Sequence, residues 1–155
     1  TQQLLGSQND MATIRLKFNV FKLRSMVKDA EINGPQWADE NDPRITKVGS
    51  FIRKTRIDEL PQLFNVLKGD MSFVGPRPER EYFYKQFDAY IPEYKERLIV
   101  KPGLTGWAQI NGGYDLDPKE KLKWDMEYIE MKTIKMDIHI LCKTVLIVLN
   151  GNGAR

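Results

Sequence analysis

The stretch that constrains the fold most is residues 57–78, which read IDELPQLFNVLKGDMSFVGPRP. Its apolar residues recur at the spacing of one helix face: Leu60, Leu63, Phe64 and Leu67. Pro61 has no backbone N–H and fits a helix only in the first turn, so we predict a helix that begins near Asp58. Gly69 is the expected left-handed cap at its end.

The adjacent carboxylates Asp58 and Glu59 allow two interpretations. A helix N-terminus favours negative charge, so a capping residue followed by a first-turn acid explains both. A phosphate-handling enzyme would use the same pair as a nucleophile and a metal ligand. Basic residues immediately upstream, Arg53, Lys54 and Arg56, favour the second interpretation.

The segment Gly75-Pro76-Arg77-Pro78 is stiff, because the prolines fix φ on both sides of the arginine. A plain turn has no need of Arg77. A phosphate site does, since guanidinium donates a planar fork to phosphate oxygens and a pre-ordered side chain loses less entropy on binding.

Two later segments also leave alternatives open. In the glycine-rich residues 101–113, Trp107 either stacks on a nucleobase whose edge is read by Gln109 or Asn111, or it fills the core of a structural loop. Asp137 opens a mostly apolar segment, where an unpaired charge is costly. It therefore either pairs with a basic residue or faces an active site.

The rest of the chain predicts helices with a small amount of strand. Residues 14–26 suit a strand or β-hairpin arm, and residues 33–49 a loop. Further helical segments are expected at residues 26–33, 79–94 and 117–149, the last opened by Asp117 as cap and Pro118 in first position. The prediction is an α+β fold, a helix-dominated single domain over residues 1–155 with a small β-hairpin or sheet.

Composition narrows the function classes. The chain has 155 residues, 41% hydrophobic and 29% charged, enough for one domain with a core. A net charge of +3 suits phosphates or anionic lipids and is too mild to indicate nucleic-acid binding. One cysteine and one histidine exclude an internal disulfide and leave a zinc site without local ligands. No apolar run reaches the roughly 18 residues of a membrane span.

Four motifs then occur in order: KLRSM, DPRITKVGSFIRKTRIDELPQLFNVLKGDMSFVGPRPE, KPGLTGWAQINGGYDL and YIEMKTIKMDIHILCKTV. Together they resemble the catalytic domain of the bacterial sugar transferases, the monotopic polyprenyl-phosphate phosphoglycosyl transferases. The resemblance runs from Phe18 to Leu149 and is closest to the larger, multi-domain members.

The resemblance implies transfer of a phosphosugar from a nucleoside diphosphate sugar, such as a UDP-sugar, to polyprenyl (undecaprenyl) phosphate, with release of a nucleoside monophosphate. It makes Asp58 the nucleophile that forms an aspartyl–phosphosugar intermediate, and Glu59 the ligand of a magnesium ion (Mg2+). Asp137 would be a further active-site acid. The substrate-binding residues that it implies are Lys22, Arg24, Arg53, Pro76, Arg77, Pro78, Thr105 and Gln109.

The resemblance also implies a place at the cytoplasmic face of the bacterial inner membrane, with amphipathic helices on the membrane surface. The family's N-terminal re-entrant membrane helix has no counterpart here, so we expect a fragment that folds as a soluble domain. A homo-oligomer is a possible partner state. The alternative function is a non-catalytic module that docks on anionic lipid or nucleotide through Arg53, Lys54, Arg56 and Arg77.

Overall fold

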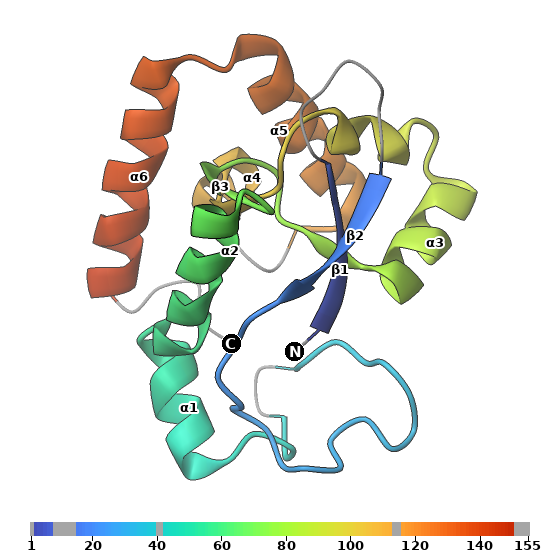
Figure 1. The fold of residues 1–155 in the computed structure, drawn as a ribbon, viewed down its shortest axis with the longest axis vertical. Helices are drawn as coiled ribbons and strands as arrows, with labels where there is room; N and C mark the ends of the chain where they lie inside the picture. Colours follow the sequence, from blue (N-terminus) through green and yellow to red (C-terminus); the bar gives the residue numbers. More distant parts are fainter. Residues whose placement is uncertain (1, 8–14, 40–41, 113–115, 151–155) are drawn as a thin grey trace.

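The computed structural model describes residues 2–7, 15–39, 42–112 and 116–150. The predicted α+β, helix-rich fold is confirmed, with two small β-sheets among the helices. Figure 1 shows α6 (Ile134–Leu149) on one flank of the molecule and α3 (Glu81–Tyr90) on the other. Strands β1 (Gln2–Ser7) and β2 (Arg15–Val20) lie beside α3.

The first sheet contains a strand that sequence reasoning did not assign. β1 pairs antiparallel with β2, Leu4 opposite Phe18, and also with the short β4 (Glu79–Arg80), which gives the order β2-β1-β4. The strand expected over residues 14–26 ends at Val20, and the chain then runs on irregularly. The prediction of a helical segment over residues 26–33 was wrong, because residues 28–33 form turns.

The second sheet brings together the two loops that the sequence singled out. β3 (Ser72–Val74) pairs parallel with β5 (Gly103–Thr105), so the loop after β3 meets the glycine-rich segment. The close approach of these two segments requires glycine at position 103, since a Cβ at Gly103 would lie 2.2 Å from the backbone nitrogen of Gly75. The glycine-rich segment, expected as a loop, contains β5 and helix α4 (Trp107–Asn111) and is more regular than expected. Gly113 of this segment lies outside the described residues.

The helix predicted to begin near Asp58 has two parts. A 3-10 helix, η1 (Ile57–Gln62), contains Pro61 and is followed by α2 (Leu63–Lys68). Gly69 ends α2 with φ 82°, as predicted. Upstream, Thr46 caps α1 (Lys47–Lys54) by accepting from the Gly49 amide.

The later helices differ from the prediction mainly in their ends. The helix expected over residues 79–94 is α3, followed by the 3-10 helix η2 (Tyr94–Ile99). The segment 117–149 forms two helices, α5 (Pro118–Met131) and α6. Asp117 caps α5 as predicted, and Thr133 separates the two helices by capping α6.

Among the described residues, the core has two larger apolar clusters and a small one formed by Val20 and Met71. Tyr84 and Phe87 of α3 pack with Ile91 and with Tyr94 and Leu98 of η2. A second cluster joins β3, α4, α5 and α6 through Val74, Ile110, Tyr128 and Ile140. By contrast, the apolar face predicted for the helix near Asp58 points outward: Leu60, Leu63, Phe64 and Leu67 are all exposed. Among the described residues, no helix has the length and apolarity needed to cross a bilayer.

Candidate active site

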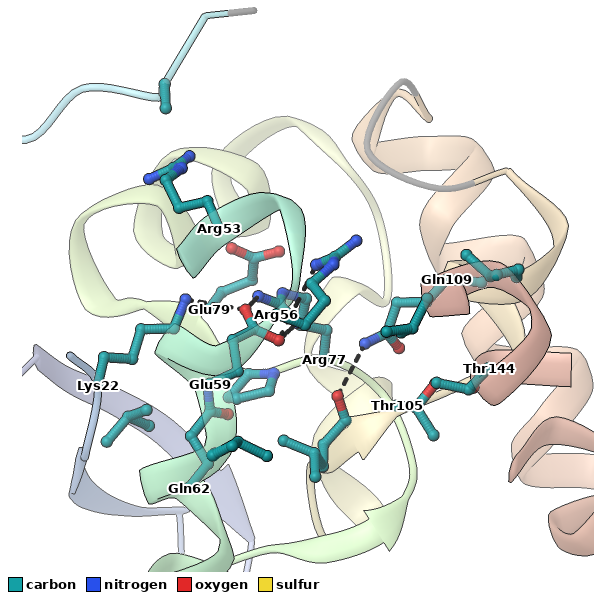
Figure 2. Close-up of a pocket in the computed structure, with 18 of the residues that line it drawn as sticks. Lys22, Arg53, Arg56, Glu59, Gln62, Arg77, Glu79, Thr105, Gln109 and Thr144 are labelled. Atoms are coloured by element: carbon teal, nitrogen blue, oxygen red, sulfur yellow. Dashed lines mark hydrogen bonds and ion pairs between the residues drawn. The ribbon is translucent and has the colours of Figure 1, made fainter. Parts of the chain in front are cut away.

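The site lies where η1 meets the chain after β2 and the loop after β3. The backbone places these segments: the Leu23 amide donates to the Asp58 carbonyl at 3.0 Å, and the Phe21 amide donates to Asn65 Oδ1 at 3.1 Å. A cavity of about 580 Å³ opens beside η1 (Figure 2). It extends to the far wall formed by α4 and α6.

Three basic side chains converge on Glu59 (Figure 2). Lys22 Nζ lies 2.9 Å from Oε1, which also accepts from Nη2 of Arg77. Arg56 Nη1 lies 4.0 Å from Oε2. Burial alone would raise the pKa of Glu59, but the charges of Arg77 and Lys22 outweigh it and hold the pKa well below its usual range. Glu59 is therefore an ionised carboxylate within a cationic cluster.

Asp58 has a different environment, although it adjoins Glu59. It is 5% exposed, and its Oδ2 lies 3.8 Å from Lys22 Nζ. Burial raises its pKa against the opposing effect of Lys22, so this carboxylate is more basic than an ordinary aspartate. Glu59 and Lys22 line the cavity, whereas Asp58 is not among the lining residues. The two carboxylates are thus electrostatically distinct.

The glycine-rich segment forms the opposite wall (Figure 2). The hydroxyls of Thr105 and Thr144 are 2.7 Å apart, and Gln109 Nε2 donates to the Leu104 carbonyl at 3.3 Å. Within the described part of the chain, two buried amide atoms of the lining residues have no hydrogen-bond partner, Gln109 Oε1 and Gln62 Nε2. Unpaired buried polar atoms in a cavity are positions where a ligand would bind.

The structure brings together most of the residues predicted to form the site. The cavity wall includes Lys22, Arg53, Glu59, Arg77, Pro78, Thr105 and Gln109. Pro76 is buried and Arg24 is exposed, and neither lines the cavity. Asp137 lies in the first turn of α6, where it accepts from the Tyr128 hydroxyl at 2.8 Å, and does not line the cavity. Its assignment as a catalytic acid stays a prediction.

The alternatives left open for Trp107 are decided in favour of the core. Its ring packs edge to face on Trp124, with centroids 6.2 Å apart, and against the cluster of β3, α4, α5 and α6. Trp107 also does not line the cavity, so the structure supports the core interpretation and gives no support to stacking on a nucleobase.

Sequence reasoning also missed several residues of the cavity wall. Gln62 follows Glu59 by three residues, and side chains at this spacing eclipse one another on a 3-10 helix, which is a usable signal once the 3-10 turn is known. Glu79 follows the Pro-Arg-Pro segment directly. Thr144 stands within the apolar run of α6 and carries no local signal.

A divalent cation would find few protein ligands at this site. Among the described residues, no group of three or more His, Cys, Asp or Glu side chains lies close enough to hold a metal ion. Oε1 of Glu59 is occupied by Lys22 and Arg77, while Oε2 has longer contacts of 3.4 Å to Arg77 and 4.0 Å to Arg56. Magnesium often takes one or two carboxylates and completes its shell with water and substrate phosphates, so Glu59 alone would supply the protein ligand, and the magnesium site stays a prediction.

Comparison with known proteins identifies the family. The model of the family described as Bacterial sugar transferase matches residues 2–151. The chain belongs to the bacterial sugar transferase family.

Three relatives of this chain carry names that differ in the sugar they give. A protein of Aeromonas hydrophila, named UDP-N-acetylgalactosamine-undecaprenyl-phosphate N-acetylgalactosaminephosphotransferase, is 48% identical over 96% of this chain and 36% of its own length. A Xanthomonas campestris UDP-glucose:undecaprenyl-phosphate glucose-1-phosphate transferase is 44% identical over 89% of this chain and 30% of its own. A Salmonella typhimurium undecaprenyl-phosphate galactose phosphotransferase is 43% identical over 88% of this chain and 31% of its own length. This bacterial sugar transferase chain thus spans about a third of these relatives.

Proposed function

We propose that this chain catalyses transfer of a sugar 1-phosphate from a nucleoside diphosphate sugar to undecaprenyl phosphate, with release of a nucleoside monophosphate. The observation that carries the proposal is the carboxylate pair Asp58–Glu59 among the basic side chains Lys22, Arg56 and Arg77, with Glu59 in the cavity wall and Asp58 adjacent to it in η1. The names of the relatives supply the substrate class, and the differing sugars in those names leave the sugar to experiment.

Asp58 is the nucleophile of the proposed first step. Its carboxylate oxygen attacks the sugar-bearing phosphorus, a new O–P bond forms, and the bond to the bridging oxygen breaks so that the nucleoside monophosphate leaves with the electron pair. In the second step an oxygen of undecaprenyl phosphate attacks the same phosphorus, and Asp58 leaves as a carboxylate. The raised pKa of Asp58 fits this role, since a more basic carboxylate is a better nucleophile.

The basic side chains bind and neutralise the diphosphate. Arg53 and Arg77 line the cavity with Lys22, and guanidinium forks match phosphate oxygens. A phosphate that repels an incoming carboxylate becomes a target only when its charge is compensated. Thr105 and Gln109, on the opposite wall, are placed to hydrogen-bond the remainder of the donor.

Magnesium is part of the proposal, held by Glu59 together with substrate phosphates. When bound, it would supply positive charge that offsets the negative charge developing on the phosphate oxygens.

A membrane surface is the proposed location, at its cytoplasmic face. The support is a set of exposed apolar side chains on consecutive helices: Phe51 of α1, Leu60 of η1, and Phe64 and Leu67 of α2. Exposed apolar surface next to basic residues is typical of a protein that lies on anionic lipid. Such a position would bring the lipid acceptor to the cavity.

The alternative, a non-catalytic anion-binding module, accounts for the arginines and leaves the carboxylates unexplained. Burying Asp58 among cations costs desolvation energy, and Glu59 cancels charge that an anion-binding surface would need. Catalysis accounts for both residues.

The direct test measures nucleoside monophosphate release from a panel of UDP-sugars with Mg2+ and detergent-dispersed undecaprenyl phosphate. Asp58→Asn should abolish release, while the matched variant Asp88→Asn on the exposed surface of α3 should retain it. Release that persists in Asp58→Asn contradicts the nucleophile. Absence of release from every nucleotide sugar, with binding that is metal-independent and falls steeply with salt, supports the binding module.

A further inference from the structure

Arg97 is a buried arginine in η2 to which neither the sequence motifs nor the proposed chemistry assign a role. It is 2% exposed. Its Nε and Nη2 donate to Asp125 Oδ2 at 3.0 and 2.6 Å, and Nη1 donates to the Tyr94 hydroxyl at 2.8 Å. Nη1 also lies 3.7 Å from Glu79 Oε1. A guanidinium charge is thus held inside the protein by two carboxylates.

The remaining contact of Arg97 reaches the active-site loop. Its Nη2 donates to the backbone carbonyl of Arg77 at 2.9 Å, across 20 residues of sequence. On the cavity side of the same residue, the Arg77 guanidinium holds the Glu59 carboxylate. Arg77 is therefore fixed at both ends, with its backbone on Arg97 and its side chain on Glu59.

The loop around Arg77 is held residue by residue. The Gly75 amide donates to the Thr105 carbonyl and the Gly103 amide to the Pro76 carbonyl, each at 2.9 Å. Further along, β4 pairs with β1. Those links are made by backbone, whereas the link at the Arg77 carbonyl is made by a side chain. Because Pro78 has no N–H, that carbonyl is the polar group through which the Arg77–Pro78 peptide plane is oriented.

The cost of this arrangement argues for a positional role. Ion pairs buried in a core add little stability over apolar side chains of the same volume. What they add is a defined geometry, and here that geometry ends at the cavity wall, where Glu79 pairs with Lys121 and both residues line the cavity. A network that served the core alone would not need to reach the Arg77 carbonyl.

We propose that Arg97 is a positioning residue: by holding the Arg77 carbonyl, it directs the Arg77 guanidinium toward Glu59 and the substrate phosphates before substrate binds. The catalytic part of this inference rests on the proposed function. The positional part concerns the folded chain alone and is tested separately.

The kinetic test uses Arg97→Lys, which keeps the positive charge for Asp125 but removes the planar fork that reaches two partners at once. We expect nucleoside monophosphate release to fall at least tenfold in kcat. Tyr94→Phe is the matched control, because it removes a hydrogen bond to Arg97 and leaves the Arg77 carbonyl contact in place. The kcat of Tyr94→Phe should stay within twofold of the parent value, even if its thermal unfolding midpoint falls as much as that of Arg97→Lys.

A double-mutant comparison distinguishes positioning from general damage. In an Arg77→Lys background the side chain that Arg97 orients is already altered, so Arg97→Lys should lower kcat less than twofold further. Equal losses in both backgrounds would show that Arg97 acts independently of Arg77 and would overturn the proposal.

NMR of the Arg77 guanidinium in the substrate-free parent and in Arg97→Lys gives a readout that needs no turnover. The signal is assigned by its loss in Arg77→Lys. We expect a rigid Nε–H with slowly exchanging Nη protons in the parent. The same signal should become averaged in Arg97→Lys, because that variant keeps the Glu59 contact and loses the backbone anchor. A side chain that averages freely in the parent, or that is equally rigid in both proteins, overturns the positional inference. A signal that is rigid in the parent and averaged in the variant, from a protein that releases no nucleoside monophosphate, contradicts the proposed function and retains the role of Arg97.

Discussion

Nζ of Lys22 lies 2.9 Å from Oε1 of Glu59, and this contact joins the chain after β2 to the 3-10 helix η1 across 37 residues. The neighbouring Leu23 amide donates to the Asp58 carbonyl at 3.0 Å, so the backbone places Lys22 where both carboxylates can be reached. The charge balance at the proposed nucleophile is therefore set by a docking contact between distant segments.

Asp58→Asn should remove activity and increase stability at neutral pH. Turnover should fall by about a thousandfold or more, as expected for loss of a covalent nucleophile. The folded-state pKa of Asp58 is raised, so its ionisation opposes folding above its ordinary pKa of 3.8, and a neutral amide removes that penalty. Denaturant unfolding at pH 7 and near pH 3 checks this, since the gain should vanish at low pH. A variant less stable than the parent at pH 7 contradicts it.

Glu59→Gln should have the opposite effect on stability. The folded-state pKa of Glu59 is lowered, so its ionised form stabilises the fold above the ordinary value of 4.5, and that contribution is lost as pH falls below it. At pH 7 the amide leaves Lys22 and Arg77 without their carboxylate, which should cost about 3 kcal/mol. The free energies of unfolding of parent and variant, measured as a function of pH, should converge as the pH is lowered toward 3. Parallel curves would show that Glu59 is not the titrating group.

Lys22 and Arg24 were predicted together as substrate-binding residues, and the structure separates them. Lys22 contacts Glu59 at the cavity, whereas Arg24 is exposed and does not line it. Lys22→Met should lower kcat/KM for the nucleotide sugar by about a hundredfold, the order expected for loss of a charged contact in a catalytic site. Arg24→Met is the matched control and should change it less than threefold. Equal losses would place Arg24 in the site.

The exposed apolar face of α2 should mediate membrane binding. Phe64 and Leu67 are 64% and 83% exposed, so replacing both with serine should leave the free energy of unfolding within about 1 kcal/mol. Co-sedimentation with anionic phospholipid vesicles should fall at least fivefold. Ile32→Ser, an equally exposed apolar position at 82% on the loop after β2, is the matched control. Unchanged sedimentation of the α2 variant would place the membrane surface elsewhere.

The local chemistry of the site could be predicted because it depends on residues that are close together in the sequence. Asp58 and Glu59 at a helix start, the Pro-Arg-Pro clamp and the Gly69 cap each follow from neighbours within a few residues. A proline fixes φ, and a glycine permits positive φ, whatever surrounds it. These constraints hold before the chain folds.

Residues whose role depends on distant partners could not be predicted in this way. Trp107 fits a base-stacking loop and a core equally well by composition, and its contact with Trp124 decides for the core. Arg97 lies in a segment, KERL, that reads as a solvated surface, yet it is buried against Asp125. The stripe Leu60, Leu63, Phe64 and Leu67 has the spacing of a buried face and lies outside. Periodicity shows that a face is apolar and leaves open what covers it.

The sequence by itself determined which groups are available for phosphate chemistry: two adjacent carboxylates, a stiff arginine clamp and a run of basic residues, all specified by local backbone rules. The tertiary structure alone decided the direction in which the pKa of each carboxylate departs from its ordinary value. Burial raises the pKa of both carboxylates, but the charges of Arg77 and Lys22 outweigh it at Glu59 and lower the pKa there, whereas the pKa of the adjoining Asp58 stays raised. The physical reason is that desolvation and Coulomb energies depend on distance through space, which the order of residues does not contain.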